Sequence, residues 1–176
     1  MEKISKIILI NFLFLFSLSC ASQNSNYLTY NEYVGIKING ISLLDIYNTR
    51  GNKKAVNALF NRNFNYESLT LPDLYKNFKD KGLYIQFLKS SIECDYELDN
   101  LMILSSNETV EIKGHKFKLG DSVIKLQKYF FKNSKSGDFI FEINPSNNIF
   151  FSTMENFFLI VIENNVITKI QYFINT

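Results

Sequence analysis

The sequence predicts an α+β protein built mainly from antiparallel strands, with two short helices. Many segments alternate apolar and polar residues with the period of two that is typical of a half-buried strand. Two segments, KKAVNALF and DSVIKLQKYFF, instead place apolar residues three and four positions apart, as an amphipathic helix does. Turn residues between the alternating segments predict hairpins, which join antiparallel strands.

The first half begins with a predicted hairpin at GIKINGISLL, where Asn39-Gly40 is a type I′ turn dipeptide between apolar alternations. The KKAVNALF helix follows, and GLYIQF then has the pattern of a strand. Residues 71–80 allow two interpretations. Pro72 can begin a helix, or LYKNF can form a strand that pairs with GLYIQF around residues 79–82.

The segment SIECDYELDN also predicts a half-buried strand. Its apolar positions alternate with four carboxylates, namely Ile92, Cys94, Tyr96 and Leu98 with Glu93, Asp95, Glu97 and Asp99. Cys94 is expected on the apolar face, where a free cysteine behaves as a small hydrophobic residue. The neighbouring carboxylates disfavour a thiolate, so a structural role is expected for this cysteine.

The second half has similar patterns. VEIKGHKFKLG predicts a hairpin, and Asp121 or Ser122 can cap the helix that follows it. Residues 139–143 alternate as a strand does, and Asn144-Pro145 ends that strand. The segment FFLIVI–ENN–VITKIQYF predicts the last hairpin, because Asn164-Asn165 tolerates left-handed backbone angles.

The order of these elements predicts two similar α+β repeats, residues 33–106 and 107–176, packed as one unit. Each contains a short hairpin, an amphipathic helix and then paired strands. The expected alignment sets Asn39-Gly40 against Lys113-Gly114, Cys94 against Ile170 and Tyr96 against Tyr172. The alternative is chance similarity among strand-like segments of an AT-rich gene.

The N-terminus predicts an export signal over residues 1–19 and a tether over residues 20–32. Two lysines precede an apolar run over residues 7–18. This run is too short to cross a bilayer core, which takes about 20 apolar residues, but it suits the apolar region of a signal peptide. A buried N-terminal helix is the alternative, although the run has no polar stripe and SQNSN follows it directly.

Cys20 is the expected lipidation site. Ser17-Leu18-Ser19-Cys20 resembles a bacterial lipobox, with serine in the usual leucine position and leucine where a small residue is commoner. Several acyl chains on this cysteine, such as palmitate, would anchor the protein stably to an envelope membrane, which one chain does not. The alternative is ordinary cleavage after Ser19-Cys20-Ala21, which would release a soluble periplasmic or secreted protein. Lipidation would leave only Cys94 and no intramolecular disulfide.

Charge and motifs argue against several classes of function. The formal net charge of +2 includes +1 from Lys3, Lys6 and Glu2 in the leader, so the remaining chain is near neutral and nucleic acid is not an expected partner. A zinc or other transition-metal site usually needs several His or Cys ligands, and His115 is the one histidine of the chain, so no such site is expected. His115, Asp121 and Ser122 are the residue types of a catalytic triad, but the sequence has no nucleophile motif such as G-x-S-x-G around the serine. No cofactor and no catalytic residue is therefore expected.

Two surfaces are candidates for binding a partner. On a strand, the four carboxylates of Glu93, Asp95, Glu97 and Asp99 would share one face. This face is either exposed to solvent, with Lys169 as a cross-strand charge, or an edge that binds a partner. The other candidate is aromatic and consists of Phe150, Phe151, Phe157 and Phe158. Adjacent strand residues face opposite sides, so one ring of each pair can be exposed, although core packing explains most rings.

The second half resembles the small lipoproteins of the outer-membrane assembly group and the related β-lactamase-inhibitor-like folds. The resemblance is carried by Leu119-Gly120-Asp121-Ser122 at the helix start and by Leu159 to Ile170 at the end of the sheet. The whole chain also resembles Bacteroidetes-like exported lipoproteins of unknown function. These resemblances imply a helix pair on a small sheet that binds another protein without catalysis.

The expected function is therefore that of a non-catalytic, lipid-anchored binding module at the cell envelope, either an assembly accessory or an immunity-type protein. A carrier of a lipid or another small apolar ligand is the first alternative, because the many phenylalanines could line a cavity. An envelope hydrolase is the second, although no acid–base pair or activated nucleophile can be named.

Overall fold

The computed structural model describes residues 27–28, 30–69, 74–89, 91, 93–127, 139–145 and 155–175 of the 176-residue chain. The predicted α+β class is confirmed. The described residues form an eight-stranded sheet, a four-stranded sheet and four short helices, of which only one has seven or more residues. Two of these helices correspond to the predicted ones.

The large sheet has the strand order β1-β10-β11-β12-β7-β6-β5-β4. Its strands are β1 (Tyr27–Leu28), β4 (Asn65–Ser68), β5 (Tyr75–Lys79), β6 (Leu83–Leu88), β7 (Glu97–Ile103), β10 (Phe139–Pro145), β11 (Glu155–Glu163) and β12 (Val166–Asn175). All neighbours are antiparallel except β1 and β10, which run parallel at one edge. Of the two interpretations of residues 71–80, the strand LYKNF is correct for β5, which pairs with β6.

The small sheet consists of two hairpins in the order β3-β2-β8-β9. Its strands are β2 (Lys37–Ile38), β3 (Ile41–Ser42), β8 (Val110–Ile112) and β9 (His115–Phe117). Both turns have positive φ at two successive residues, 53° and 87° at Asn39-Gly40 and 50° and 79° at Lys113-Gly114. These are the φ values of a type I′ turn, which was predicted for Asn39-Gly40, and they also occur at the turn of the second predicted hairpin.

The helices are α2 (Tyr30–Val34), α3 (Leu43–Asn48), α4 (Lys53–Phe60) and α5 (Val123–Gln127). In the α4 N-cap, Asn52 Oδ1 accepts a hydrogen bond from the Ala55 N–H at 3.1 Å. The helix α3 was not predicted, because its apolar residues continue the pattern of the preceding hairpin. Ser42 caps α3 by accepting from the Asp45 N–H at 3.1 Å.

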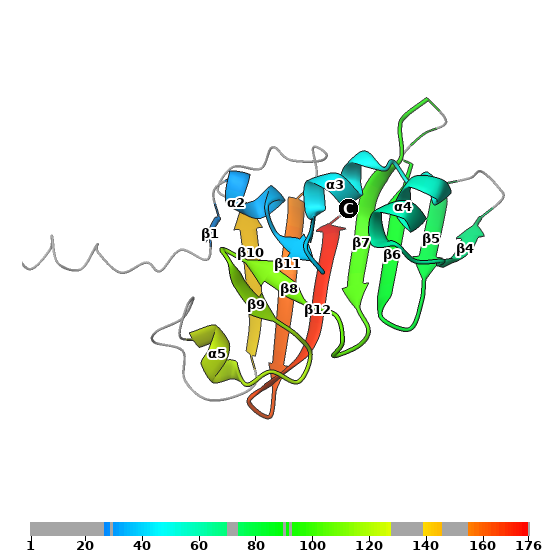
Figure 1. The fold of residues 1–176 in the computed structure, drawn as a ribbon. Coiled ribbons are helices and arrows are strands. Elements are labelled where there is room, and N and C mark those ends of the chain that lie inside the picture. Colours follow the sequence, from blue (N-terminus) through cyan, green and yellow to red (C-terminus); the bar gives the residue numbers. More distant parts are fainter. Residues whose placement is uncertain are drawn as a thin grey trace, which may run out of the picture.

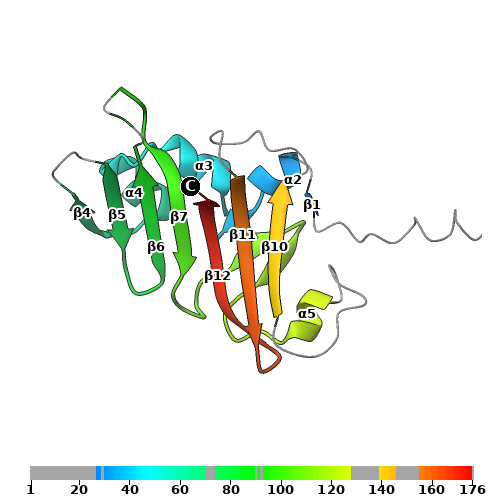
Figure 2. The same cartoon turned by 180° about the vertical axis from the view of Figure 1, so that it is seen from behind.

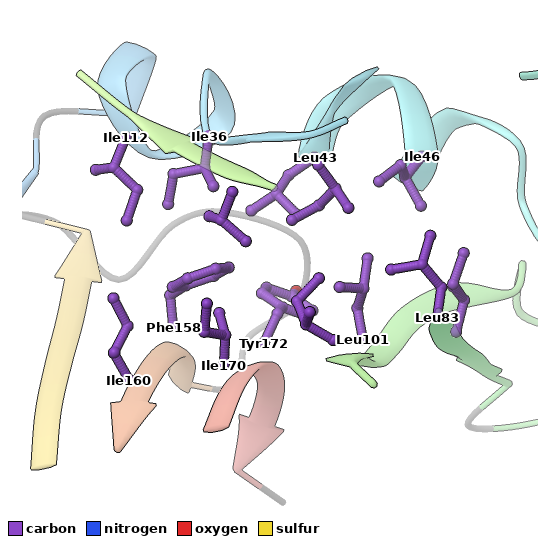
Figure 3. Close-up of a cluster of buried hydrophobic side chains, with 14 of the residues drawn as sticks. Ile36, Leu43, Ile46, Leu83, Leu101, Ile112, Phe158, Ile160, Ile170 and Tyr172 are labelled. Carbon is purple, nitrogen blue, oxygen red and sulfur yellow. The ribbon is translucent and has the colours of Figure 1, made fainter. Parts of the chain in front are cut away.

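The core lies between the large sheet on one side and the small sheet with α2 and α3 on the other (Figure 1). In Figure 3, Ile36, Leu43 and Ile112 face Phe158, Ile170 and Tyr172 across this layer. All six side chains have an exposed fraction of 0%. Burial of these large apolar groups is the main favourable contribution to folding.

Each predicted repeat contributes one hairpin to the small sheet and one antiparallel run of strands to the large sheet. The repeats meet at β2 with β8 and at β7 with β12. Leu101 pairs with Tyr172 at the centre of the second junction. The order of elements agrees with a duplication, which stays a prediction.

The expected strand SIECDYELDN begins later than its alternation suggests. Leu88 and Glu97 form the last pair between β6 and β7, so the residues before Glu97 have no neighbouring strand to pair with. The prediction of a buried Cys94 is therefore wrong. Cys94 is exposed, and its Sγ lies 3.1 Å from the hydroxyl of Ser91, which donates to it.

The hydroxyl of Tyr33 has no hydrogen-bond partner in the described structure, although the side chain has an exposed fraction of 0%. Burial raises the pKa of Tyr33 far above its usual value. An unsatisfied buried hydroxyl is costly, so Tyr33→Phe is expected to raise the free energy of unfolding by about 1 kcal/mol. Urea denaturation monitored by circular dichroism checks this.

The matched control is Tyr172→Phe, because the equally buried Tyr172 hydroxyl donates to the Leu98 carbonyl at 3.4 Å. This substitution is expected to lower the free energy of unfolding, since it leaves that carbonyl without the tyrosine donor. A loss of stability in Tyr33→Phe as large as in Tyr172→Phe would contradict the prediction.

Candidate functional site

One face of the large sheet is not covered by any described helix or strand. Figure 2 shows β5, β6, β7, β12, β11 and β10 side by side, with the labelled helices α2, α3 and α4 behind them. On β6 the buried Leu83, Ile85 and Phe87 alternate with the partly exposed Tyr84 and Gln86. The partly exposed positions point to the uncovered side, because neighbouring strand residues face opposite sides.

The strand register brings the partly exposed side chains together into a continuous surface, here called the docking face. It consists of Asn77, Tyr84, Gln86, Glu97, Asp99, Asn100, Met102, Gln171 and Phe173. Gln86 pairs with Asn77 on one side and with Asn100 on the other. Met102 lies between Tyr84 and Gln171 in the next row.

Hydrogen bonds hold the amides of the docking face in place. Asn77 Oδ1 accepts from Gln86 Nε2 at 2.9 Å and from the Tyr84 hydroxyl at 3.2 Å. Asn100 Oδ1 accepts from Gln171 Nε2 at 3.0 Å, which links β7 of the first half to β12 of the second. These bonds restrict the side-chain rotamers, so less conformational entropy is lost when a partner binds.

Two carboxylates lie on β7 within this face. The register shifts between Gln86 and Phe87, so Asp99 is an extra residue without a partner on β6, as in a β-bulge. Burial raises the pKa of Asp99, and burial also raises the pKa of Glu97 against the opposing effect of nearby Arg50. Neither carboxylate forms an ion pair with a cation of the described residues.

The predicted acidic ladder is therefore only half on a strand. Glu93 and Asp95 are exposed in the segment before β7. Since β7 lies between β6 and β12, its carboxylates are in the middle of the sheet and cannot form a partner-binding edge. Lys169 is not their cross-strand charge either, because the pairing of Gln171 with Met102 places Lys169 beyond Met102, away from Asp99.

The four phenylalanines also separate. Phe158 is fully buried in the core, opposite Tyr172. Phe157 is described only through its backbone pairing with Phe173. Phe150 and Phe151 lie outside the described residues, and so does Cys20.

Most of the docking face was missed in the sequence. Its amides occupy polar positions of alternating strands, as in GLYIQF, where glutamine looks like any solvated residue. The missing information was which strands are neighbours, because only neighbouring strands place Asn77, Gln86 and Asn100 in one row.

His115, Asp121 and Ser122 belong to the small sheet and to the start of α5, where the two side chains of Asp121 and Ser122 form local contacts. The Ser122 hydroxyl accepts from the Ile124 N–H at 3.3 Å at the start of α5, as an N-cap does. Asp121 pairs with Lys125 at 2.7 Å, and His115 begins β9 in the small sheet. The described residues contain no group of three or more His, Cys, Asp or Glu that could hold a metal ion.

A second polar cluster lies between the two sheets. The Glu108 carboxylate accepts from Arg62 Nη1 at 3.0 Å and Nη2 at 2.8 Å, and Asn39 Nδ2 also donates to it. Arg62 Nη1 reaches Asp80 at 3.1 Å. Burial would raise the pKa of Asp80, but hydrogen bonds from the Leu83 and Gly82 N–H groups and from Arg62 outweigh this and lower it. Every member has partners, so the cluster joins elements and leaves no group free for a ligand.

The pKa of Asp99 predicts how the stability of the protein responds to a neutral side chain at this position. Because the folded-state pKa of Asp99 is raised, the folded protein is more stable when this side chain is protonated. This contribution to the free energy of unfolding is complete below the unfolded-state pKa of about 3.9. That stability is lost as the pH rises through the folded-state pKa. Asp99→Asn, which is always neutral, is therefore expected to be more stable than the wild type at pH 7.

Urea denaturation from pH 3 to pH 8 checks this prediction. The difference in the free energy of unfolding is expected to be small at pH 3 and to grow to a plateau of about 1 kcal/mol or less above the folded-state pKa. Glu163→Gln, an exposed carboxylate at the β11–β12 turn, is the control. A constant difference at all pH values would contradict the assigned cause.

No helix of the described residues is both long and apolar enough to cross a membrane. No family model, curated protein or solved structure matches the chain.

Proposed function

We propose that this protein is an exported bacterial lipoprotein, anchored to an envelope membrane through Cys20, that binds another protein without catalysis. The docking face would make the contact. The observation that carries the proposal is an uncovered sheet face with a central row of hydrogen-bonded amides beside Tyr84, Met102 and Phe173.

The composition of this face fits a protein interface. Tyrosine, phenylalanine and methionine are enriched in the centres of interfaces, where lysine and glutamate are depleted. In the docking face these side chains flank Gln86 and Asn100, and charged side chains lie around them, with Lys79 of β5 directly opposite Tyr84 and with Glu97 and Asp99 on β7. A rigid sheet that offers amide donors and acceptors beside apolar groups can recognise a partner through both area and hydrogen bonds.

The lipid anchor rests on the sequence of the leader and on the resemblance to envelope lipoproteins. Tyr27 in β1 is seven positions after Cys20 in the sequence. An extended chain of that length spans at most about 25 Å. An acylated Cys20 would thus hold the β1–β10 edge of the sheet near the membrane and leave the edge at β4 farthest along the sheet from it.

A protein-binding role is favoured over a carrier of apolar ligands because the described phenylalanines pack against one another. Phe78 contacts Phe64 and Phe87 edge to face, with ring centroids 6.4 and 5.9 Å apart. Rings that fill the core in this way do not need a ligand to cover them.

Photocrosslinking tests the docking function. A benzoylphenylalanine placed at Gln86 of the full chain, in cells of the native host, is expected to give an adduct of defined mass with one envelope protein. The control position is Lys54, which is exposed on α4, on the other side of the sheet. Adducts of the same mass at both positions, or none at Gln86, would overturn the proposal that this face binds a protein.

Metabolic labelling with palmitate tests the anchor. Label is expected in the wild-type protein and not in Cys20→Ala, whereas Cys94→Ala keeps it. A mature protein that begins at Ser22 and carries no label would show that ordinary signal cleavage occurs instead.

A further inference from the structure

We infer that the side of the molecule formed by α5 lies against an anionic membrane surface, with Ile124 among the lipids and with Lys118 and Lys125 at the phosphate groups. The inference rests on the proposed lipid anchor at Cys20 and adds the orientation that the anchored domain takes. The exposure of Ile124, the charges around it and the reach of the tether support it.

Ile124 is the most exposed of the large apolar side chains that the structure describes. Its exposed fraction is 71%, against 56% for Leu69 and 38% for Leu104. The two other apolar residues of the same helix, Val123 and Leu126, are buried in the core. Covering Ile124 with an apolar phase would be favourable, because it removes this side chain from water.

Lysine side chains lie beside Ile124. Lys125 follows it directly on α5, and its Nζ lies 2.7 Å from Oδ2 of Asp121. The same oxygen accepts a hydrogen bond from the Lys118 N–H at 3.0 Å, so Lys118 and Lys125 are neighbours. Both lysines are exposed, whereas only 15% of the Asp121 side chain is exposed. An apolar residue with accessible ammonium groups beside it fits the boundary between acyl chains and anionic head groups.

The net charge of this side is only slightly positive. Lys116 on β9 is also exposed, and the β11–β12 turn contributes the exposed Glu163. With Lys118, Lys125 and Asp121, this gives three positive and two negative charges. So small an excess does not recruit a free protein to a membrane, but it can orient a domain that acyl chains already hold there.

The tether allows this side to reach the membrane. Figures 1 and 2 show α5 on the same side of the molecule as β1 and β10, opposite the β4 edge. α5 begins at the β11–β12 turn, where the Val123 N–H donates to the Asn165 carbonyl at 2.8 Å, and β10 starts beside this turn. β1 pairs with the other end of β10, about 20 Å away along the strand. A tether that spans at most about 25 Å can therefore bring Cys20 and Ile124 to one membrane plane.

Anchoring makes a weak contact sufficient. A short flexible tether gives an effective concentration in the millimolar range, so the anchored domain meets the same membrane repeatedly. The insertion of one isoleucine beside two lysines then favours this orientation several-fold. With α5 on the membrane, the strands of the large sheet run along the membrane plane, and the docking face stays open to a partner.

Tryptophan fluorescence tests the inference, because the chain contains no tryptophan of its own. Ile124→Trp is introduced into the full acylated protein, which is reconstituted in vesicles of phosphatidylcholine and phosphatidylglycerol. When the acyl chains of the phosphatidylcholine carry bromine, the fluorescence is expected to fall at least about twofold, because bromine quenches tryptophan on contact. Leu69→Trp, at the opposite β4 edge, is the control and is expected to keep its fluorescence.

Charge variants locate the contact. Lys118→Gln combined with Lys125→Gln is expected to reduce the quenching of Ile124→Trp by about twofold. The matched control is Lys53→Gln combined with Lys54→Gln, which removes two exposed lysines of α4 and leaves the quenching unchanged.

Three results would overturn the inference. The first is equal quenching of Ile124→Trp and Leu69→Trp, and the second is quenching that the Lys118 and Lys125 variant does not change. The third is a blue shift of the Ile124→Trp emission that appears without vesicles and grows with protein concentration, which would show that a second copy covers this residue.

The outcomes for the anchor and for the orientation are distinguishable. Selective quenching of Ile124→Trp in a palmitate-labelled protein supports both. A palmitate-labelled protein in which neither tryptophan is quenched leaves the anchor standing and overturns the orientation. If the wild type carries no palmitate, the anchor falls, and Ile124→Trp in the Cys20→Ala protein is mixed with phosphatidylglycerol vesicles. Quenching there would support the membrane contact of α5, and its absence would overturn it.

Discussion

Arg62→Ala is expected to lower the free energy of unfolding by about 3 kcal/mol. The Glu108 side chain has an exposed fraction of only 7%, and it accepts two hydrogen bonds from Arg62 at 3.0 and 2.8 Å. Without the guanidinium, this carboxylate stays buried with Asn39 as its remaining side-chain donor. Breaking a buried ion pair from one side is costly because an uncompensated charge remains, whereas the intact pair contributes little by itself.

Urea denaturation at pH 7 of the wild type, Arg62→Ala, Glu108→Gln and the double variant measures the effect. The double variant is expected to lose less stability than the sum of the two single losses. Once Glu108 is replaced by glutamine, the removal of Arg62 no longer leaves an unpaired buried carboxylate. The control is Lys113→Ala. Lys113 pairs with Glu32 at 3.2 Å with both side chains more than a third exposed, so the loss is expected to stay below about 1 kcal/mol. Similar losses in Arg62→Ala and Lys113→Ala would contradict the argument.

Gly82→Ala is expected to cost a similar amount for a steric reason. A Cβ atom at Gly82 would lie 1.9 Å from Glu108 Oε1 and 2.6 Å from Glu108 Cδ. The backbone of Gly82 is not left-handed, so strain of the main chain does not enter. Glu108 is held by Arg62 and Asn39 and must leave that position, which breaks its ion pair. We expect a loss of about 2 to 3 kcal/mol.

Rescue distinguishes this mechanism from a general effect of the added methyl group. In a Glu108→Ala background the contact is gone, and Gly82→Ala is expected to cost less than about 1 kcal/mol. Gly114→Ala is the control for backbone strain, since Gly114 has a φ of +79° and open space around it. Its loss is expected to be about 1 kcal/mol and the same in both backgrounds. If Gly82→Ala lowers the free energy of unfolding as much in the Glu108→Ala background as in the wild type, the steric explanation is wrong.

Local chemistry was sufficient for the turns and for the period of each element. Asn39-Gly40 and Asn164-Asn165 adopt the positive φ values that their residue types predict. The helix at KKAVNALF is α4, and the hairpin of β11 and β12 lies where the alternation places it. In these cases the few residues involved hold the determining interactions themselves, so neighbours distant in sequence change little.

The limits of strands were less predictable. SIECDYELDN alternates without a break, but the strand starts at Glu97, because β6 ends at Leu88 and provides no partner before it. The same pairing decides the fate of Cys94, which the alternation alone places in the core. A period of two records which residues can share a face, but the ladder of backbone hydrogen bonds needs a second strand.

The sequence alone thus determined the α+β class and the turns, since these depend on composition and on contacts between near neighbours. Only the tertiary structure decided where β7 lies, which of its carboxylates join Tyr84 and Gln86 on one surface, and that Arg62 meets Glu108. Arg62 and Glu108, for example, are 46 positions apart in the sequence. Such contacts arise from the packing of whole elements, which the polarity pattern of one element does not encode.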